Sequence, residues 1–265
     1  MSTRILNRLV AGALVANALV AGPSFAASGA PAALRGRWVV QQVAVDSNDR
    51  LHRSSEPDDP RLMGNVLDIR ADGTLDPTRQ DCKHARWQPR RATSLAAIVA
   101  RNKRESGGRI ERPSLADYAL TFGDPTLAPY EAFCTSEAGK RESFNGGNWF
   151  ASVSESRMIE GNGVDTVLVY DRITDATPVK PSFACAPDQD TSEKAICNSQ
   201  ILAGLDRSVA LAYRRARERT GDTPAGDEAL RKEQADWIAE RDRCKADENC
   251  LILRMGDRID ALMQR

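Results

Sequence analysis

The positions of the six cysteines constrain the fold of this 265-residue chain more than any other feature. Two of them, Cys82 and Cys134, lie before residue 180, and the other four follow it: Cys185, Cys197, Cys244 and Cys250. An even number of cysteines in an exported chain is typical of a disulfide framework. We therefore expect three disulfides. One joins Cys82 to Cys134 in an N-terminal domain, and two lie in a C-terminal domain.

Export is indicated by residues 1–27. Two arginines precede an apolar run over 9–21, and the run ends in glycine, proline and small residues. This is the layout of a secretory signal peptide. The apolar run has about a dozen residues, against the roughly 20 that span a bilayer, so we expect no permanent membrane anchor. Cleavage near Ala26 or Ala27 is predicted to release a periplasmic or secreted protein.

The balance of charges argues against a nucleic-acid partner. Lys+Arg and Asp+Glu both number 37 in the whole chain. They number 21 each over 28–180, and 14 against 16 over 181–265. Neither segment has the basic excess that a nucleic-acid-binding domain normally shows.

Residues 28–177 are predicted to form an antiparallel β domain, either a small barrel or a sandwich. Short apolar runs alternate there with turn-forming residues, which is the pattern of hairpin-connected strands. The runs occupy residues 38–45, 66–69, 118–122, 130–133, 149–153 and 164–170. Between them, the stretch over 90–113 is expected to hold one or two helical turns within a long loop.

The β domain also resembles lipocalin-type barrels at two places. Gly36, Arg37 and Trp38 open the first apolar run, and Arg172 follows the last one. In lipocalins, the tryptophan of a Gly-x-Trp motif closes one end of the barrel beneath a late arginine. The resemblance implies a barrel that could hold a small apolar ligand. A core tryptophan in an unrelated β fold would explain the same residues.

The spacing of apolar residues changes after a proline-containing linker at 178–184. Over 185–265 these residues recur at helical spacing and predict three amphipathic helices packed as a small bundle. The whole chain is therefore predicted to be α+β with two domains. An antiparallel β barrel or sandwich, lipocalin-like in type, precedes a disulfide-stapled three-helix bundle.

Capping signals predict the limits of these helices. Asp190 and Glu193 form a capping-box pattern at the start of the first helix. A glycine after a threonine at 220–221 is expected to end it. The second helix is expected over about 226–245, and the third from about residue 249.

The helical segment resembles the LprI-type lysozyme-inhibitor domain over residues 181–265. The resemblance rests on the last four cysteines and on the residues spaced among them. Those residues are Phe183, Glu193, Ala195, Ile196, Leu205, Asp206, Tyr213, Gln234, Trp237, Arg241, Asp242, Leu251, Arg258 and Ile259. The resemblance implies a helical domain in an exported protein of the bacterial cell envelope, with a lysozyme as its protein partner.

The four cysteines of this domain allow three pairings. We favour Cys185 with Cys197 at the start of the first helix, and Cys244 with Cys250 around the turn between the last two. Metal binding is the alternative, although exported cysteines usually oxidise and the tight spacing of zinc ligands is missing.

Seven family-signature positions are expected to have structural or binding roles: Glu193, Asp206, Tyr213, Gln234, Trp237, Arg241 and Arg258. For the two aromatic residues we favour core packing over a ligand site. For Arg241, we favour an internal ion pair with Asp206 and Asp242 that orients the helices.

Motifs of catalysis and metal binding are missing from the sequence. It has two histidines, His52 and His84, and lacks a Gly-x-Ser-x-Gly elbow, a phosphate-binding loop and a His-Glu-x-x-His motif. We therefore expect no catalytic residue, no metal site and no cofactor, and a protein that is not an enzyme. The alternative is a cell-wall hydrolase that uses two carboxylates.

Two functions are predicted as alternatives. In the first, the protein binds a peptidoglycan-cleaving lysozyme and blocks its cleft, while acidic loop residues meet a cationic surface. Those acids, which have helix capping and solvation as another explanation, are Asp188, Asp190, Asp222, Asp247 and Glu248. In the second, the protein is a non-catalytic binding or structural module whose β barrel holds a small apolar ligand. A deep apolar cavity would favour this second function, and a filled barrel would count against it.

Overall fold

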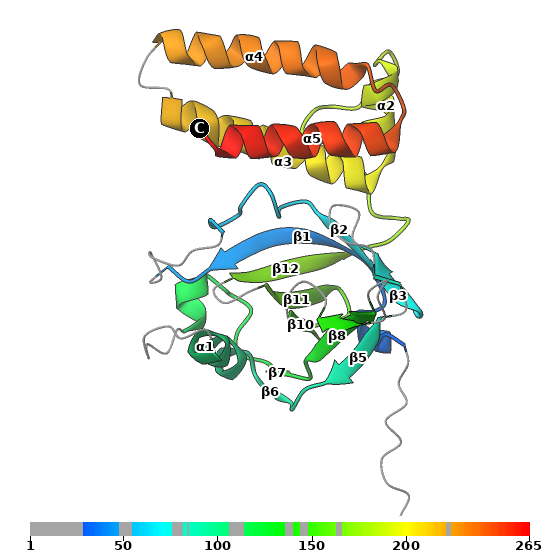
Figure 1. The fold of residues 1–265 in the computed structure, drawn as a ribbon, viewed down its shortest axis with the longest axis vertical. Coiled ribbons are helices and arrows are strands. Elements are labelled where there is room, and N and C mark those ends of the chain that lie inside the picture. The colour runs from blue at the N-terminus through cyan, green and yellow to red at the C-terminus, as the bar shows by residue number, and fades with distance from the viewer. Residues whose placement is uncertain are drawn as a thin grey trace, which may run out of the picture.

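A curled β sheet lies beneath a layer of helices in the computed structural model (Figure 1). The predicted signal peptide, His52, His84 and Asp222 lie outside the residues that the structure describes. The described residues are 29–47, 55–75, 82–83, 85–105, 114–135, 140–143, 148–162, 166–220 and 224–265.

Ten strands in the described residues form one antiparallel sheet, with the order β4-β3-β2-β1-β12-β11-β10-β8-β5 and with β9 paired to β8. The strands are β1 (Gly36–Val45), β2 (Val66–Ile69), β3 (Gly73–Leu75), β4 (Cys82–Lys83), β5 (Arg86–Pro89), β8 (Tyr130–Thr135), β9 (Arg141–Ser143), β10 (Trp149–Ser152), β11 (Arg157–Asn162) and β12 (Thr166–Ile173). The expected disulfide between Cys82 and Cys134 joins β4 at one edge to β8 near the other. The sheet therefore curls into a half-barrel, which confirms the predicted antiparallel β domain.

Large side chains from nearly every strand fill the inside of this half-barrel. They include Trp38, Phe150 and Met158, each almost completely buried. A polar group lies among them, because the buried carboxylate of Glu160 accepts hydrogen bonds from the hydroxyl of Tyr170 and the amide of Asn148. An interior filled in this way counts against the predicted apolar ligand.

Trp38 lies near the start of β1 and is buried in the core of the half-barrel. Its indole Nε1 donates to the carbonyl oxygen of Leu34, 2.8 Å away, in the short 3-10 helix η1 (Ala32–Leu34). The guanidinium of Arg172 lies 4.0 Å from the centroid of the indole ring and donates to the carbonyl of Arg35 at 2.6 Å. The expected contact between tryptophan and arginine is present, but this contact alone does not establish a lipocalin-like domain.

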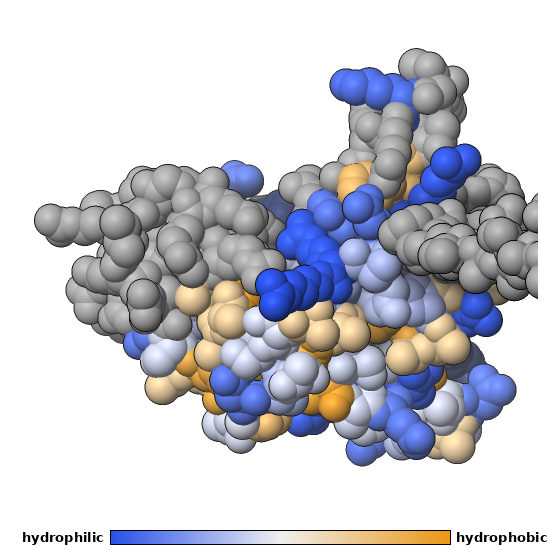
Figure 2. Space-filling view, turned by 90° about the horizontal axis from the view of Figure 1, so that it is seen from below, coloured by the Kyte–Doolittle hydropathy of each residue, from blue (hydrophilic) through white to orange (hydrophobic). Residues whose placement is uncertain are grey.

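The outer face of β10, β11 and β12 is covered by helix α1 (Leu95–Glu105), the 3-10 helix η2 (Leu115–Tyr118) and the paired strands β6 (Thr93–Ser94) and β7 (Thr126–Leu127). Helix α1 has 11 residues, so it is longer than the one or two turns predicted. Seen from below, the face of the β domain that points away from the helical layer mixes hydrophilic and hydrophobic residues (Figure 2). Such a mixture is ordinary for a solvated surface.

The helical domain contains α2 (Thr191–Asn198), α3 (Gln200–Thr220), α4 (Pro224–Asp242) and α5 (Glu248–Met263). The first predicted helix is divided in two, because Ser199 has extended backbone angles (φ −122°, ψ 123°). Its hydroxyl accepts a hydrogen bond from the amide of Leu202 and so caps α3. Helices α3 and α5 run side by side, and α4 lies above them (Figure 1).

Helix α3 joins the two domains. Its Ile201 packs on the outer face of the sheet against Val39, Val66 and Ile173. One turn further along, the backbone of α3 comes so close to the turn before β2 that both facing positions are glycine, Gly64 and Gly204. Because a side chain at either position would collide with the other backbone, these glycines allow the two domains to pack closely.

Candidate functional site

An exposed loop over 184–189 precedes α2 and is held at several points. The disulfide between Cys185 and Cys197 ties it to the last turn of α2. The Gln189 side chain spans it, because its oxygen accepts from the amide of Ala186 (3.0 Å) and its nitrogen donates to the carbonyl of Ala184 (2.9 Å). Residues 184–188 are nevertheless exposed. We call this segment the stapled loop, and it is a rigid element presented to solvent.

Helix α2 starts directly after the stapled loop. The carboxylate of Asp190 accepts hydrogen bonds from the amide of Glu193 (2.8 Å) and the hydroxyl of Ser192 (2.7 Å). Burial acts against the charged form, but these hydrogen bonds outweigh it and hold the pKa of Asp190 below its usual value. Asp190 is therefore the predicted N-cap, and it stabilises the helix on which the loop is mounted.

A second stapled turn lies at the same end of the domain. The disulfide between Cys244 and Cys250 spans the turn between α4 and α5, where Asp247 caps α5 by accepting from the amide of Cys250 (3.0 Å). The carboxylate of Glu248 accepts from the hydroxyl of Ser199 at 2.8 Å, which links the turn to the junction of α2 and α3. Both preferred pairings are therefore confirmed, and both disulfides brace one end of the helical domain.

The acids expected to meet a cationic partner differ in how they are engaged. Asp190 and Asp247 cap helices, and Glu248 bonds to Ser199. Asp188 is exposed in the stapled loop and has no hydrogen bond or ion pair within the described residues. It is therefore the acid of this group most available to a partner. Exposed cations also lie at this end of the domain: Lys194, Arg243 and Lys245.

Three signature residues meet where α3 and α4 face each other. Arg241 is buried, donates to Asp242 at 2.7 Å and lies 4.0 Å from the carboxylate of Asp206. Asp206 also accepts from the backbone amide of Ser182 at 2.6 Å. The guanidinium of Arg241 lies 5.7 Å from the ring centroid of Trp237. This group links α3, α4 and the chain before the stapled loop.

Two more signature residues, Arg258 and Gln234, meet near Trp237. The guanidinium of Arg258 lies 5.8 Å from the Trp237 ring centroid and donates to Gln234 (2.9 Å) and Glu233 (2.6 Å). The hydrogen bond from Arg258 lowers the pKa of Glu233, although burial opposes it and Arg265 adds to the effect. These contacts hold α4 on α5, so they favour an architectural role for the signature.

Glu193 and Tyr213 stay outside this group. Glu193 is half-buried in the first turn of α2. Its backbone amide donates the hydrogen bond to the carboxylate of Asp190. Tyr213 is half-buried on α3 and packs against the helical core. The roles of the seven signature residues remain predictions.

The chemistry available at the cysteines is limited, because all six are joined in disulfides. No cluster of three or more metal-ligating side chains occurs among the described residues. Within those residues, no helix is both long and apolar enough to cross a membrane. Three disulfides fit a protein of an oxidising compartment outside the cytoplasm.

Two residues that matter for the geometry, Gln189 and Glu160, are absent from the sequence-based predictions. Gln189 clamps the stapled loop, but a lone glutamine in a loop carries no signal of that role. Glu160 is buried inside the half-barrel. The strand pattern could have indicated this, because Glu160 lies two residues after the inward-facing Met158 and so points to the same side of the sheet. A charged residue at an inward position indicates an internal polar group.

Comparison with known proteins identifies the helical domain. Residues 184–262 match the family model described as Lysozyme inhibitor LprI, which confirms the resemblance over the stapled loop and all four helices. No curated protein and no solved structure matches the chain. The family match does not extend to the β domain, and no comparison supports its likeness to lipocalins.

Proposed function

We propose that this chain, whose residues 184–262 form an LprI lysozyme inhibitor domain, is an exported protein that binds a peptidoglycan-cleaving lysozyme and blocks its cleft. The observation that carries the proposal is the coincidence of this family match with the rigid, exposed stapled loop. The matched family is named for inhibiting an enzyme, so we propose a binding role for the helical domain and no catalytic one.

The stapled loop is the proposed contact with the lysozyme. A loop that is already ordered loses little conformational freedom on binding, so more of the contact energy appears as affinity. The disulfide to Cys197 and the two hydrogen bonds of Gln189 supply that order. Asp188 projects from the loop without an intramolecular partner in the described residues and would complement a cationic lysozyme surface.

Export to the periplasm or the medium is part of the same proposal. The segment over 1–27 has the pattern of a cleavable signal, and the three disulfides need an oxidising environment. The mass of the protein recovered from the periplasm tests it. A chain that starts at residue 27 or 28 is expected, and a full-length chain retained in the cell would contradict export.

The test of inhibition is a cell-wall clearing assay with the purified, oxidised mature protein and lysozymes of different types. At about 10 µM protein we expect at least one type to lose most of its activity. Full activity of every lysozyme tested would refute the proposal.

Matched variants test the role of the stapled loop. Asp188→Arg is expected to weaken inhibition about tenfold by repelling a cationic surface. Asp257→Arg makes the same change at another exposed acid, on α5, and should leave inhibition unchanged. Gln189→Ala keeps the net charge but removes both clamping bonds, so it should also weaken inhibition. Equal inhibition by all three variants would remove the loop from the proposed contact.

A further inference from the structure

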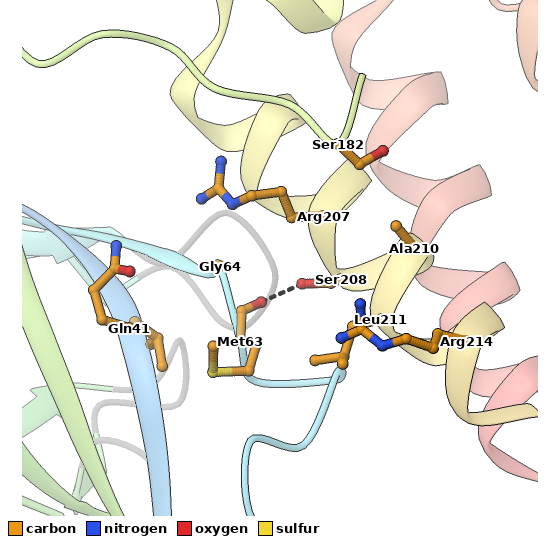
Figure 3. A pocket seen from close by; sticks show the side chains of 10 residues that line it. Gln41, Met63, Gly64, Ser182, Arg207, Ser208, Ala210, Leu211 and Arg214 are labelled. Carbon is orange, nitrogen blue, oxygen red and sulfur yellow. Dashed lines mark hydrogen bonds between the residues drawn. The ribbon is translucent and has the colours of Figure 1, made fainter. Parts of the chain in front are cut away.

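A pocket of about 390 Å³ lies between the two domains (Figure 3). One wall is formed by β1 and the turn before β2, and the other by one side of α3. The hydroxyl of Ser208 on α3 donates to the carbonyl of Met63 and so bridges the two walls. The volume lies within the range of small-molecule sites.

The pocket combines apolar walls with positive charge. Met63 and Leu211 contribute apolar surface, and the side chains of Arg207 and Arg214 reach out from α3 (Figure 3). Sites for small ligands commonly have this composition, with apolar walls and a few polar groups that orient the ligand.

The two pocket arginines differ from the other arginines of α3. Arg215 pairs with Glu56, Arg217 pairs with Asp227, and Arg219 donates to a carbonyl oxygen on α5. Within the described residues, Arg207 donates only to the carbonyl of Lys180, and Arg214 has no hydrogen bond or ion pair. The guanidinium groups that line the pocket therefore have donors left for an anion.

The environment of Arg207 also favours an anion. Burial lowers the pKa of its guanidinium, while the neighbouring charge of Asp206 acts in the opposite direction. Asp206 itself is already engaged by the amide of Ser182 and by Arg241. A half-buried cation of this kind is stabilised when a carboxylate replaces the water that it has lost.

A β-bulge places a polar side chain at the same pocket. In the pairing of β1 with β12, Val40 lies opposite Tyr170 and Gln42 opposite Val169, so Gln41 is the extra residue. Bulges of this kind redirect a side chain and are common beside functional sites. The amide of Gln41 lines the pocket across from α3 and forms no hydrogen bond within the described residues (Figure 3).

We propose that this interdomain pocket binds a small organic carboxylate with an apolar substituent. Arg207 binds the carboxylate, Arg214 adds positive electrostatic potential, and the side-chain amide of Gln41 is available as a further hydrogen-bond donor. Met63 and Leu211 contact the apolar part. None of the residues that line the pocket belongs to the stapled loop, so this proposal does not depend on lysozyme inhibition.

The test uses the ¹³C-labelled methionine methyl groups of the full mature protein. Met63 lines the pocket, whereas Met158 lies inside the half-barrel and Met255 in the helical core. N-acetyl-leucine should shift the Met63 signal with a dissociation constant on the order of 1 mM, and leave the other two in place. N-acetyl-leucinamide has the same apolar part without the charge, so it should bind about tenfold more weakly.

Variants and a second probe complete the test. Arg207→Gln should weaken binding of N-acetyl-leucine about tenfold, whereas Arg254→Gln, the same change on α5, should not alter it. No shift of Met63, an equal response to the amide, or unchanged binding to Arg207→Gln would overturn the proposal. Equal binding of inorganic phosphate would also overturn it, by showing a bare anion site without selection for the apolar part.

Discussion

Replacing Gly204 by alanine tests the packing of the two domains. A Cβ at this position would lie 2.1 Å from the carbonyl oxygen of Gly64, whereas ordinary contacts start at 3.4 Å. The atoms that it meets belong to backbone, so α3 and the turn before β2 must separate by about 1.3 Å. That separation weakens the nearby bond from Ser208 to Met63 and the packing of Ile201 on the sheet.

We expect Gly204→Ala to lower the free energy of unfolding by about 2 kcal/mol, because overpacking typically costs about 1 to 3 kcal/mol. Gly256→Ala is the matched control, since Gly256 lies in α5 and a Cβ there meets no atom within 4 Å. The free energy of unfolding of this control should rise by about 0.5 to 1 kcal/mol, because alanine has a higher helix propensity than glycine. Urea denaturation followed by circular dichroism measures both variants. Equal stability of the two would refute the described contact between the domains.

Three further predictions concern the helical domain. Arg241→Ala should lower the free energy of unfolding by about 3 kcal/mol, because it leaves the buried Asp206 without its cation, and urea denaturation measures the loss. Replacing Cys185 and Cys197 together by serine should lower the free energy of unfolding by about 2 to 3 kcal/mol and lower the Tm in a thermal melt. An unchanged Tm would mean that this disulfide does not stabilise the protein. The pKa of Asp190 is lowered in the folded protein, so its ionised carboxylate stabilises the fold. This stabilisation is complete above the unfolded pKa near 4 and is lost as the pH falls through the folded pKa. Asn keeps the cap without the charge, so the Tm of Asp190→Asn should fall less than that of the wild type between about pH 5 and pH 2.

Local features of the helical domain were predictable because nearby residues determine them. The Asp190 cap and the disulfide pairings each depend on residues within a few turns of one another. The break at Ser199 was not predictable in this way, because apolar residues keep their helical spacing beyond it. The Ser199 hydroxyl instead bonds to Glu248, which lies 49 positions further along the chain. Tertiary contact therefore overrides the local helical pattern.

The contacts between the domains could not be predicted from the sequence either. Gly64 and Gly204 each have an ordinary local explanation, and only their approach in space shows why both are glycine. The same holds for the pocket, since Gln41 comes from a bulge in β1 and Arg207 from a helix in the other domain. Pairings between distant segments leave no periodic pattern along the chain.

Calorimetric titration of a lysozyme with the oxidised mature protein most directly tests whether the stapled loop blocks the lysozyme cleft. The lysozyme should be one that the protein inhibits in the clearing assay, measured both alone and with its cleft filled by a chitin oligosaccharide. We predict one-to-one binding that the oligosaccharide abolishes. Binding that is unchanged when the cleft is filled, or no binding at all, would contradict inhibition by occupation of the cleft.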